Sequence, residues 1–382
     1  MQDATDLPST LILAGRPYPL DQLIEQPEPA VDAALTDNAH DTWRFCHQWL
    51  TGQHEFVVNT SGSTGPPKPI TLTREQMIAS ARLTGATLGL HRGQHMLVCL
   101  PTRYIAGRMM LVRGFVLGLN MTIVEPASDA FAALPPQSHF DFAAFVPLQL
   151  QTLLAGPPHY HAILNGMQAI LIGGGPVSPA LHAQLQTIHA PVYHTYGMTE
   201  TVTHVALRRL NGPDASATFT PLIGVKLGID SRGCLHIRSE VTQNQTVQTN
   251  DLVDLQADGR FVWLGRWDNV INSGGVKVQV EKVERALEGV LYTLGLGTRR
   301  FFVGALPDDR LGETVTAVIE GAALDDNITT AVRDGLKQQV HPYEVPRRFY
   351  DVLHFIETPT GKIDRKANLL NITSMATEVA AT

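Results

Sequence analysis

The chain has 382 residues, 44% hydrophobic and 17% charged, with a formal net charge of −7. This composition is typical of a globular protein with room for two or more domains. The negative charge argues against nucleic-acid binding. No apolar run approaches the roughly 18 residues of a membrane-spanning helix, which argues against membrane insertion. The first ten residues lack the apolar segment of a signal peptide, and the three cysteines lack metal-ligand spacing, so we expect a cytoplasmic protein with reduced thiols.

Short apolar runs alternate with amphipathic ones between residues 55 and 200. The apolar runs predict strands over 55–58, 95–100, 121–124, 142–146, 169–172 and 192–195. The amphipathic runs predict helices over 73–88, 106–117, 148–154 and 179–187, the first of which opens with a Thr-x-x-Gln capping box. This alternation predicts a mostly parallel sheet covered by helices, with ligands at the carboxyl ends of the strands.

The pattern changes after residue 205 to short alternating runs, which predict a small subdomain of antiparallel strands. Beyond Asp268 the sequence predicts a helix over 280–287, strands over 301–306 and 314–320, and a helix over 328–339. These elements would form a compact α+β unit of about 100 residues. We therefore predict an α/β protein with a large N-terminal domain, 1–267, and a small C-terminal domain, 268–382, whose last dozen residues form a frayed tail.

One loop has a composition suited to phosphate binding. Residues 59–69 read Asn-Thr-Ser-Gly-Ser-Thr-Gly-Pro-Pro-Lys-Pro, directly after the apolar run 56–58. Glycines let backbone N–H groups close around a phosphate, hydroxyls add donors, and Lys68 adds positive charge. The Gly-Lys-Ser/Thr ending of a Walker loop is absent. A Ser/Thr/Gly-rich loop alone is more often a solvated linker, but this loop is predicted to follow a strand and lead into a helix, where a parallel sheet binds phosphate.

Four later segments accompany this loop. They are Leu-Ile-Gly-Gly-Gly-Pro at 171–176, Thr-Tyr-Gly-Met-Thr-Glu at 195–200, Thr-Asn-Asp-Leu at 249–252 with Gly-Arg-Trp-Asp-Asn at 265–269, and Pro-Thr-Gly-Lys-Ile-Asp-Arg-Lys at 359–366. In this order the five motifs resemble the core motifs of the adenylate-forming superfamily, which includes acyl- and aryl-CoA synthetases, firefly luciferase and the adenylation domains of peptide synthetases. The resemblance extends from about residue 55 to about residue 370.

The resemblance implies a reaction in two steps. A carboxylate attacks the α-phosphate of ATP, pyrophosphate leaves, and a thiol such as that of CoA then attacks the acyl-adenylate. Because the carboxylate and the triphosphate are both anionic, the site must gather positive charge and N–H donors around the phosphates. ATP, Mg²⁺ and CoA are therefore the cofactor and co-substrates that the resemblance implies.

The resemblance also assigns roles to individual residues. The β- and γ-phosphates would be held by Thr60, Ser61, Ser63, Thr64, Gly65 and Lys68. The adenine would be framed by Gly173, Gly174, Gly175 and Tyr196, and the ribose bound by Asp251 with Arg266 nearby. Thr199 would donate a hydrogen bond to the α-phosphate, and the carboxylate of Glu200 would bind Mg²⁺, a hard cation that prefers oxygen.

The C-terminal domain would be mobile and would carry the catalytic lysine. By resemblance, Lys362 reaches the reacting carboxylate and the α-phosphate during adenylation, and Asp268 lies at the hinge. A rotation of roughly residues 269–370 would then withdraw Lys362 and admit CoA through a tunnel lined by Gly274 and Gly275.

Each of these residues also has a structural interpretation. Lys362 could be a solvated lysine in a turn, Gly173–Gly175 a strand-ending turn, Glu200 a carboxylate favoured at a helix start, and Asp268 a surface residue. The five motifs in register favour the functional interpretation. Two departures from the family pattern stand out. Arg103-Tyr104 replaces the frequent Phe-His pair, which makes Tyr104 the candidate for the histidine's role, and Asn269 replaces the second acid at the hinge.

The compact length and the segments 104–113 and 196–208 look like those of o-succinylbenzoate–CoA ligases of menaquinone synthesis. That substrate has two carboxylates, of which the succinyl one is activated while the benzoate one must be recognised by a cation or polar donors. The candidates for this acid pocket are Tyr104, Arg108, Arg113, Thr203 and His204. The two arginines are five residues apart on a predicted helix, so they point to different faces and are not both expected to contact the acid.

Other interpretations stay open at this stage. The enzyme could activate another small acid, or it could load the phosphopantetheine arm of a carrier protein. The chain could also be a non-catalytic adenylate-binding protein, although the presence of Lys68, Glu200 and Lys362 argues against this. The expected partners are a small carboxylic acid, ATP and CoA, and the sequence leaves a homodimer open.

Overall fold

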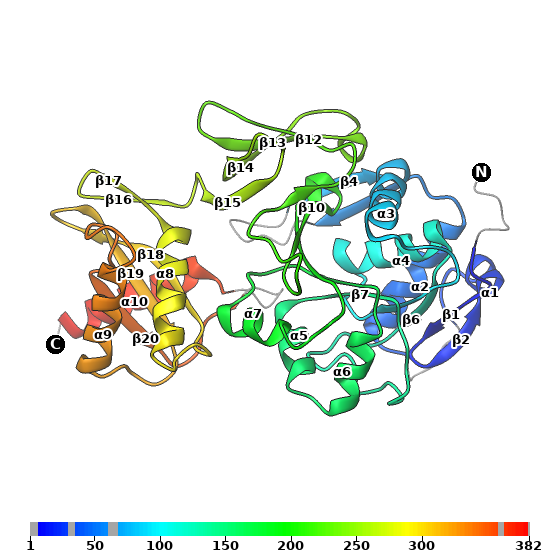
Figure 1. The fold of residues 1–382 in the computed structure, drawn as a ribbon, viewed down its shortest axis with the longest axis horizontal. Coiled ribbons are helices and arrows are strands. Elements are labelled where there is room, and N and C mark those ends of the chain that lie inside the picture. Colours follow the sequence, from blue (N-terminus) through cyan, green and yellow to red (C-terminus); the bar gives the residue numbers. More distant parts are fainter. Residues whose placement is uncertain (1–6, 30–34, 60–67, 358–362, 381–382) are drawn as a thin grey trace.

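The computed structural model describes residues 7–29, 35–59, 68–357 and 363–380. In this part of the chain, a large lobe is built on a nine-stranded sheet and a smaller lobe on a five-stranded sheet (Figure 1). The last strand of the large lobe ends at Arg266 and the first strand of the small lobe begins at Val270, so residues 267–269 join the two lobes. The predicted α/β fold class is confirmed, whereas the domain boundary between residues 267 and 268 stays a prediction.

The nine-stranded sheet runs in the order β11-β10-β9-β8-β7-β5-β6-β1-β2. Its strands are β1 (Thr10–Leu13), β2 (Arg16–Pro19), β5 (His95–Val98), β6 (Asn120–Ile123), β7 (Phe142–Phe145), β8 (Ala169–Ile172), β9 (Val192–Gly197), β10 (His204–Arg209) and β11 (Thr220–Pro221). The six strands from β9 to β1 in this order pair in parallel, and β2, β10 and β11 pair antiparallel at the edges. The predicted parallel sheet is therefore present, extended by antiparallel edge strands.

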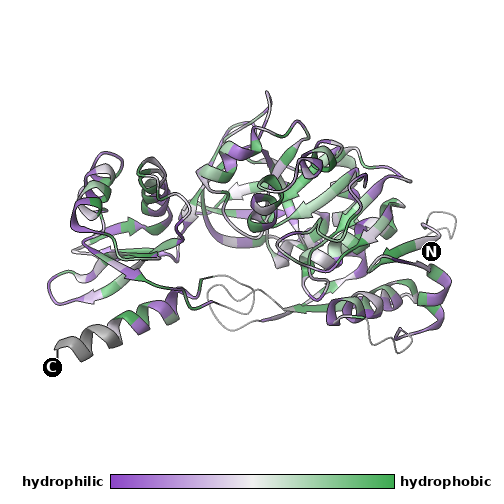
Figure 2. Cartoon of the chain, turned by 90° about the horizontal axis from the view of Figure 1, so that it is seen from below, coloured by the Kyte–Doolittle hydropathy of each residue, from purple (hydrophilic) through white to green (hydrophobic). Residues whose placement is uncertain are grey.

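Helices cover both faces of this sheet because its central strands are apolar on both sides. In β5, Met96 and Val98 face one buried cluster while Leu97 faces the other, as the two-residue period of a strand requires. The first cluster includes residues of α2 (Asp37–Leu50), α3 (Arg74–Leu88) and α4 (Ile105–Leu117), and the second includes residues of α5 (Pro147–Leu154), α6 (Pro158–Asn165) and α7 (Pro179–Leu185). Helix α1 (Leu20–Glu25) follows β2. Figure 2 shows the apolar strands inside the lobe.

Helix α3 begins as the sequence predicts. The Thr73 hydroxyl accepts a hydrogen bond from the Gln76 backbone N–H, and the Gln76 side chain accepts one from the Thr73 N–H. This reciprocal capping satisfies two amide donors that the first helical turn leaves unpaired. Gly89 ends the helix in the left-handed conformation, at a φ of 66° that a residue without a Cβ adopts at little cost.

Two smaller sheets complete the large lobe. Strands β3 (Glu55–Asn59) and β4 (Pro69–Thr73) form an antiparallel pair. Strands β12 (Lys226–Ile229), β13 (Cys234–Arg238), β14 (Val247–Leu255) and β15 (Phe261–Arg266) form a four-stranded antiparallel sheet, with a short 3-10 helix, η2 (Glu240–Thr242), after β13. The predicted small β subdomain is thus present. The prediction that the 60–68 loop leads directly into a helix is wrong, because β4 intervenes and the loop joins two antiparallel strands.

The small lobe has its own sheet and core. Its strands are β16 (Val270–Ser273), β17 (Val276–Gln279), β18 (Phe301–Asp308), β19 (Gly312–Glu320) and β20 (Arg348–Val352), with β20 parallel to β19. Its helices are α8 (Val280–Thr293), α9 (Asp326–Lys337) and α10 (Arg365–Ala380). The predicted frayed tail from residue 371 is wrong as far as residue 380, because α10 continues to Ala380. No helix in the described ranges is long and apolar enough to cross a membrane.

Candidate nucleotide and acid site

The glycine turn predicted to frame the adenine follows β8, at the carboxyl end of a central parallel strand. The Gly173 N–H donates to the Phe145 carbonyl at 3.1 Å, which fixes the start of the turn on β7. A Cβ at position 173 would lie 2.4 Å from the Thr195 hydroxyl oxygen, and Gly174 has a φ of +81°. The turn therefore needs glycine at 173 for space and at 174 for backbone conformation.

Tyr196 and Asp251, predicted to bind adenine and ribose, are in direct contact. The Tyr196 hydroxyl donates to Asp251 Oδ2 at 2.7 Å, and Trp263 Nε1 donates to Asp251 Oδ1 at 3.2 Å. The Asp251 backbone is fixed as well, since its N–H donates to the Thr249 hydroxyl at 3.0 Å. Burial, and then the adjacent Asp251 carboxylate, raise the pKa of Tyr196, so its hydroxyl stays a donor.

Arg266 and Asp268, predicted for the ribose and the hinge, form a bidentate ion pair. Arg266 Nε and Nη2 donate to the two carboxylate oxygens of Asp268 at 2.8 and 2.6 Å, and Asn250 Nδ2 donates to Asp268 Oδ2 at 3.2 Å. The bonds from Arg266 are the main cause that lowers the pKa of Asp268. Arg266 lies opposite Asp251 in the β14–β15 register, yet its guanidinium is bound by the linker between the lobes.

Thr199 and Glu200 begin a short 3-10 helix, η1 (Thr199–Thr201), one residue after β9 ends. The Thr201 hydroxyl accepts a hydrogen bond from the Met198 N–H at 3.0 Å and donates to the Thr203 carbonyl at 2.8 Å, which holds this turn in shape. Val202 closes the turn at a φ of 65°, a conformation that a β-branched residue rarely adopts. Such strain is typical of functional sites held by the surrounding fold. Glu200 is exposed at the end of β9.

Polar side chains of α3, of β10 and of the residue before β10 gather around Arg113 of α4. Its Nη2 donates to the Thr203 hydroxyl at 3.1 Å, and its Nε donates to the Thr84 hydroxyl of α3 at 3.2 Å. Ser80 Oγ lies 2.8 Å from the Thr203 hydroxyl, and His204 Nε2 lies 3.1 Å from that of Thr84. Three of the five residues predicted for the acid pocket, Arg113, Thr203 and His204, thus lie together. With Ser80 and Thr84 they form a group that we call the Arg113 cluster.

The Arg113 cluster is a buried positive site. Arg113 is 3% exposed, and no carboxylate in the described part of the chain forms an ion pair with it. Burial lowers the pKa of Arg113 to about 10, so it stays charged at neutral pH. Burial, followed by the Arg113 charge, lowers the pKa of His204 well below 6.5, so the imidazole is neutral. A buried, uncompensated guanidinium is costly, and an anionic ligand would remove that cost.

Arg108 and Tyr104 do not join this cluster. Arg108 Nη1 donates to the Val57 carbonyl at 2.9 Å, and its Nε donates to the Thr102 carbonyl at 3.2 Å. Tyr104 is the N-cap of α4, and the Arg103 guanidinium lies 4.9 Å from the centre of its ring. Arg108 and Arg113 therefore contact different parts of the lobe, as their five-residue spacing predicts.

The remaining predicted residues lie apart or outside the described residues. Thr60, Ser61, Ser63, Thr64, Gly65 and Lys362 lie outside the described residues. Lys68 is exposed directly before β4. Gly274 and Gly275 form the turn between β16 and β17, with φ of +59° and +82°, and the Gly274 N–H donates to the Leu311 carbonyl at 2.9 Å.

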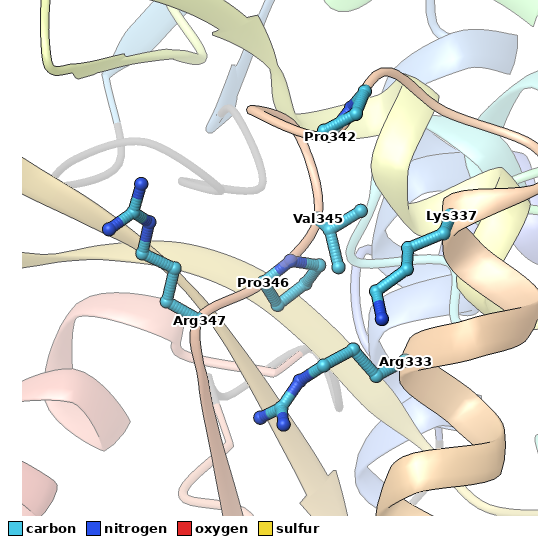
Figure 3. A pocket seen from close by; sticks show the side chains of 6 residues that line it. All are labelled: Arg333, Lys337, Pro342, Val345, Pro346 and Arg347. Carbon is cyan, nitrogen blue, oxygen red and sulfur yellow. The ribbon is translucent and has the colours of Figure 1, made fainter.

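A separate hollow of about 280 Å³ lies on the small lobe (Figure 3). It is lined by Arg333, Lys337, Pro342, Val345, Pro346 and Arg347. Lys337 is paired with Asp334 at 2.7 Å, and the Arg333 guanidinium lies over the Phe349 ring at 5.4 Å. None of the predicted site residues lines this hollow.

Comparison with known proteins establishes the family. A family model described as AMP-binding enzyme matches residues 25–231, more than half of the 382 residues. The chain belongs to this family. A probable 2-succinylbenzoate–CoA ligase of Mycobacterium tuberculosis is 30% identical over 341 residues, covering 82% of this chain and 83% of the relative. The enzyme is therefore an AMP-forming acid–thiol ligase, as the sequence predicts.

Solved structures agree with the fold of this AMP-binding enzyme. An acyl-CoA synthetase (AMP-forming)/AMP-acid ligase II-like protein from Dyadobacter fermentans is 43% identical, covering 91% of this chain and 97% of that one, with a TM-score of 0.60. An o-succinylbenzoate coenzyme A synthetase from Bacillus subtilis, in complex with ATP and magnesium ion, is 21% identical, covering 81% and 68%, with a TM-score of 0.66. The second likeness concerns the fold alone.

The residues of this AMP-binding enzyme fit ATP with Mg²⁺. Protein sites usually hold Mg²⁺ through one or two carboxylates, with water and substrate phosphates supplying the other oxygens. Glu200 offers one exposed carboxylate beside Thr199, at the strand end where a parallel sheet binds ligands. No group of three or more His, Cys, Asp or Glu side chains suited to a metal occurs among the described residues.

Sequence reasoning missed three residues of this site. Ser80 and Thr84 are four apart on α3, and polar side chains on the buried face of a predicted helix are a signal that could have found them. Trp263 donates to Asp251 across two antiparallel strands. That contact depends on a register irregularity after Leu252, for which the sequence carries no signal.

We expect Tyr196→Phe to weaken ATP binding severalfold and to lower the free energy of unfolding by about 1–3 kcal/mol, because the buried Asp251 carboxylate loses a donor. ATP titration and urea unfolding measure the two effects. Tyr193→Phe is the matched control, since its hydroxyl accepts only a long bond of 3.4 Å from Arg209 on the same pair of strands. Equal effects of the two substitutions would contradict the assignment of Tyr196 to the nucleotide site.

Proposed function

We propose that this enzyme activates o-succinylbenzoate with ATP and Mg²⁺ and transfers the acyl group to the thiol of CoA, a step of menaquinone synthesis. The succinyl carboxylate attacks the α-phosphate, pyrophosphate leaves, and the mixed anhydride that forms is attacked at its carbonyl by the thiol with release of AMP. The enzyme contributes positioning and charge stabilisation, because the covalent changes take place within the substrates.

The observation that carries the choice of acid is the Arg113 cluster. A guanidinium that is buried with hydroxyl partners, and with no carboxylate partner among the described residues, is suited to receive an anionic group. A substrate with one carboxylate uses it for the reaction and leaves the Arg113 charge unmatched. A dicarboxylate can present its second carboxylate to Arg113 while the first reacts. The named relative from M. tuberculosis supports the same acid.

The nucleotide residues divide the work of the first step. Gly173–Gly175 and Tyr196 frame the adenine, and Asp251 accepts hydrogen bonds from the ribose hydroxyls. Thr199 would donate to the α-phosphate, and Glu200 would hold Mg²⁺, which would offset charge on the phosphates. Lys68 and the hydroxyls of the preceding loop stabilise the departing pyrophosphate.

The small lobe would rotate between adenylation and thioester formation. Lys362 would contact the reacting carboxylate and the α-phosphate during adenylation. Rotation about Asp268 would remove it and bring Gly274 and Gly275 to the thiol path. The Arg266–Asp268 ion pair joins a ribose residue to the hinge, so nucleotide binding and lobe rotation would be linked through one guanidinium.

Pyrophosphate release tests this function. Wild-type enzyme is incubated with ATP, Mg²⁺ and one acid at a time, with and without CoA, using o-succinylbenzoate, benzoate, a short fatty acid and an amino acid. We expect release to be fastest with o-succinylbenzoate, and a CoA thioester of its succinyl arm to form. Faster release with another acid would overturn the substrate, and release without a thioester would overturn CoA as the acceptor.

A further inference from the structure

A buried asparagine of α10 ties together the two segments that flank Lys362. Asn368 is 2% exposed. Its Oδ1 accepts a hydrogen bond from the Ile356 N–H at 3.0 Å, and its Nδ2 donates to the Ile356 carbonyl at 2.9 Å. Ile356 lies six residues before Lys362 in the sequence, and Asn368 lies six residues after it. One side chain therefore binds the chain before the lysine to the helix after it.

The second N–H of the Asn368 amide also has a backbone partner. Nδ2 donates to the Asp364 carbonyl at 2.7 Å, and the Asp364 N–H donates to the Ile356 carbonyl at 2.9 Å. A buried amide is costly unless it is hydrogen-bonded, and here both donors and the acceptor are paired. A side chain that only filled this space could be apolar. The amide instead satisfies backbone groups on both sides of Lys362.

Direct pairing and apolar contacts hold the same segments on the small lobe. Glu357 and Ile363 form an isolated antiparallel bridge. Phe355, directly before Ile356, is buried in a cluster with Phe302 of β18, and Ile363 packs against this cluster. Both segments are thus fixed to each other and to the sheet of the small lobe.

Ion pairs add to this arrangement at the surface. Arg300 Nη1 donates to Glu357 Oε1 at 2.6 Å, and Arg365 Nη2 donates to Glu284 Oε2 of α8 at 3.0 Å. Exposed ion pairs contribute little, because solvent screens the charges. The buried amide of Asn368 therefore contributes more to joining the two segments than these pairs do.

We propose that Asn368 is a positioning residue for Lys362, since it fixes both segments that carry this lysine. The inference rests on the assignment of Lys362 to adenylation in the proposed function. Stabilisation by a placed charge depends on geometry, and a displacement of about 1 Å can lower a rate about 100-fold. Asn368 acts through backbone bonds, so it affects the adenylation step in which Lys362 takes part. The attack of the thiol, from which rotation withdraws the lysine, does not depend on it.

The two half-reactions of Asn368→Leu separate positioning from a general structural role. Leucine fills a similar volume but cannot form the three hydrogen bonds of the amide. Pyrophosphate exchange into ATP with o-succinylbenzoate measures adenylation, and thioester formation from synthetic o-succinylbenzoyl adenylate and CoA measures the second step. We expect the exchange rate to fall about 10- to 100-fold while thioester formation changes by less than about 2-fold. Asn368→Ser, which keeps a hydroxyl, should lose less exchange activity and serves if Asn368→Leu does not fold.

Asp325→Ala is the structural control on the same lobe. Asp325 Oδ1 accepts from the Ile328 N–H at 2.7 Å and caps α9, which does not flank Lys362. Loss of this cap weakens the small lobe without removing a bond near the lysine. Both half-reactions of this variant should therefore change by the same factor, below about 2-fold.

Three results would overturn the inference. Wild-type exchange in both Asn368 variants, alongside slow exchange in Lys362→Ala, would remove Asn368 and leave the proposed mechanism intact. An equal loss of both half-reactions in the Asn368 variants would show a structural role alone. Wild-type exchange in Lys362→Ala would overturn the assignment of the lysine, and this inference with it.

Discussion

Lys362→Ala should lower the rate of adenylation by about 100- to 1,000-fold while leaving ATP affinity nearly unchanged. The lysine is assigned to the charge that develops between the carboxylate and the α-phosphate, whereas ATP in the ground state is bound by the large lobe. Acid-dependent exchange of radiolabelled pyrophosphate into ATP measures the first quantity, and calorimetric titration with ATP measures the second.

Lys366→Ala is the matched control for this experiment. Lys366 is exposed in the first turn of α10, four residues further along the chain, and has the same charge. Its replacement should change the exchange rate by less than about 2-fold, because exposed lysines contribute little. A Lys362 variant that exchanges pyrophosphate as fast as the wild type would refute the assigned mechanism.

Arg113→Met should lower kcat/KM for o-succinylbenzoate by about 100-fold, because the second carboxylate loses its buried partner. The same substitution should change kcat/KM for 4-oxo-4-phenylbutanoate little, because this acid keeps the reacting arm and lacks the ring carboxylate. The wild type should prefer the dicarboxylate strongly, and the variant should lose most of this preference. Pyrophosphate release with each acid gives kcat/KM, and hence the ratio between the two acids, for the wild type and for the variant.

Arg108→Met distinguishes the two predicted arginines. Arg108 donates to the Val57 and Thr102 carbonyls, so its loss should destabilise the fold without changing the ratio between the two acids. The structure of the Arg113 cluster also predicts that Arg113→Met does not destabilise the enzyme severely, since no carboxylate in the described part of the chain would lose its partner. A preserved preference for the dicarboxylate in Arg113→Met would remove Arg113 from the acid pocket.

Local signals explain which elements the sequence could predict. The Thr73–Gln76 capping box and the apolar run at 169–172 are complete within a few residues, and both elements are present where expected. Strand β4 (Pro69–Thr73) was missed because it is short, begins with proline and precedes the helix cap directly. The continuation of α10 to Ala380 was missed because the mixed polar and apolar residues after residue 370 have no clear helical periodicity.

The candidate site divides in the same way. The order of the motifs predicted that Tyr196 and Asp251 bind the same nucleotide, and their side chains are in contact in the structure. The five-residue spacing of Arg108 and Arg113 predicted their separation, but spacing alone could not show that Arg113 is the one that is buried. That distinction depends on how α3 and α4 pack, and Thr84 of α3 supplies the contact that marks Arg113.

A competition experiment tests the central claim most directly. Wild-type enzyme, ATP, Mg²⁺ and CoA are mixed with equal concentrations of o-succinylbenzoate and 4-oxo-4-phenylbutanoate, and the thioesters are quantified by mass spectrometry. The account predicts that the o-succinylbenzoate thioester dominates and that AMP forms in equal amount. Predominance of the monocarboxylate thioester, or no thioester of either acid, would contradict it.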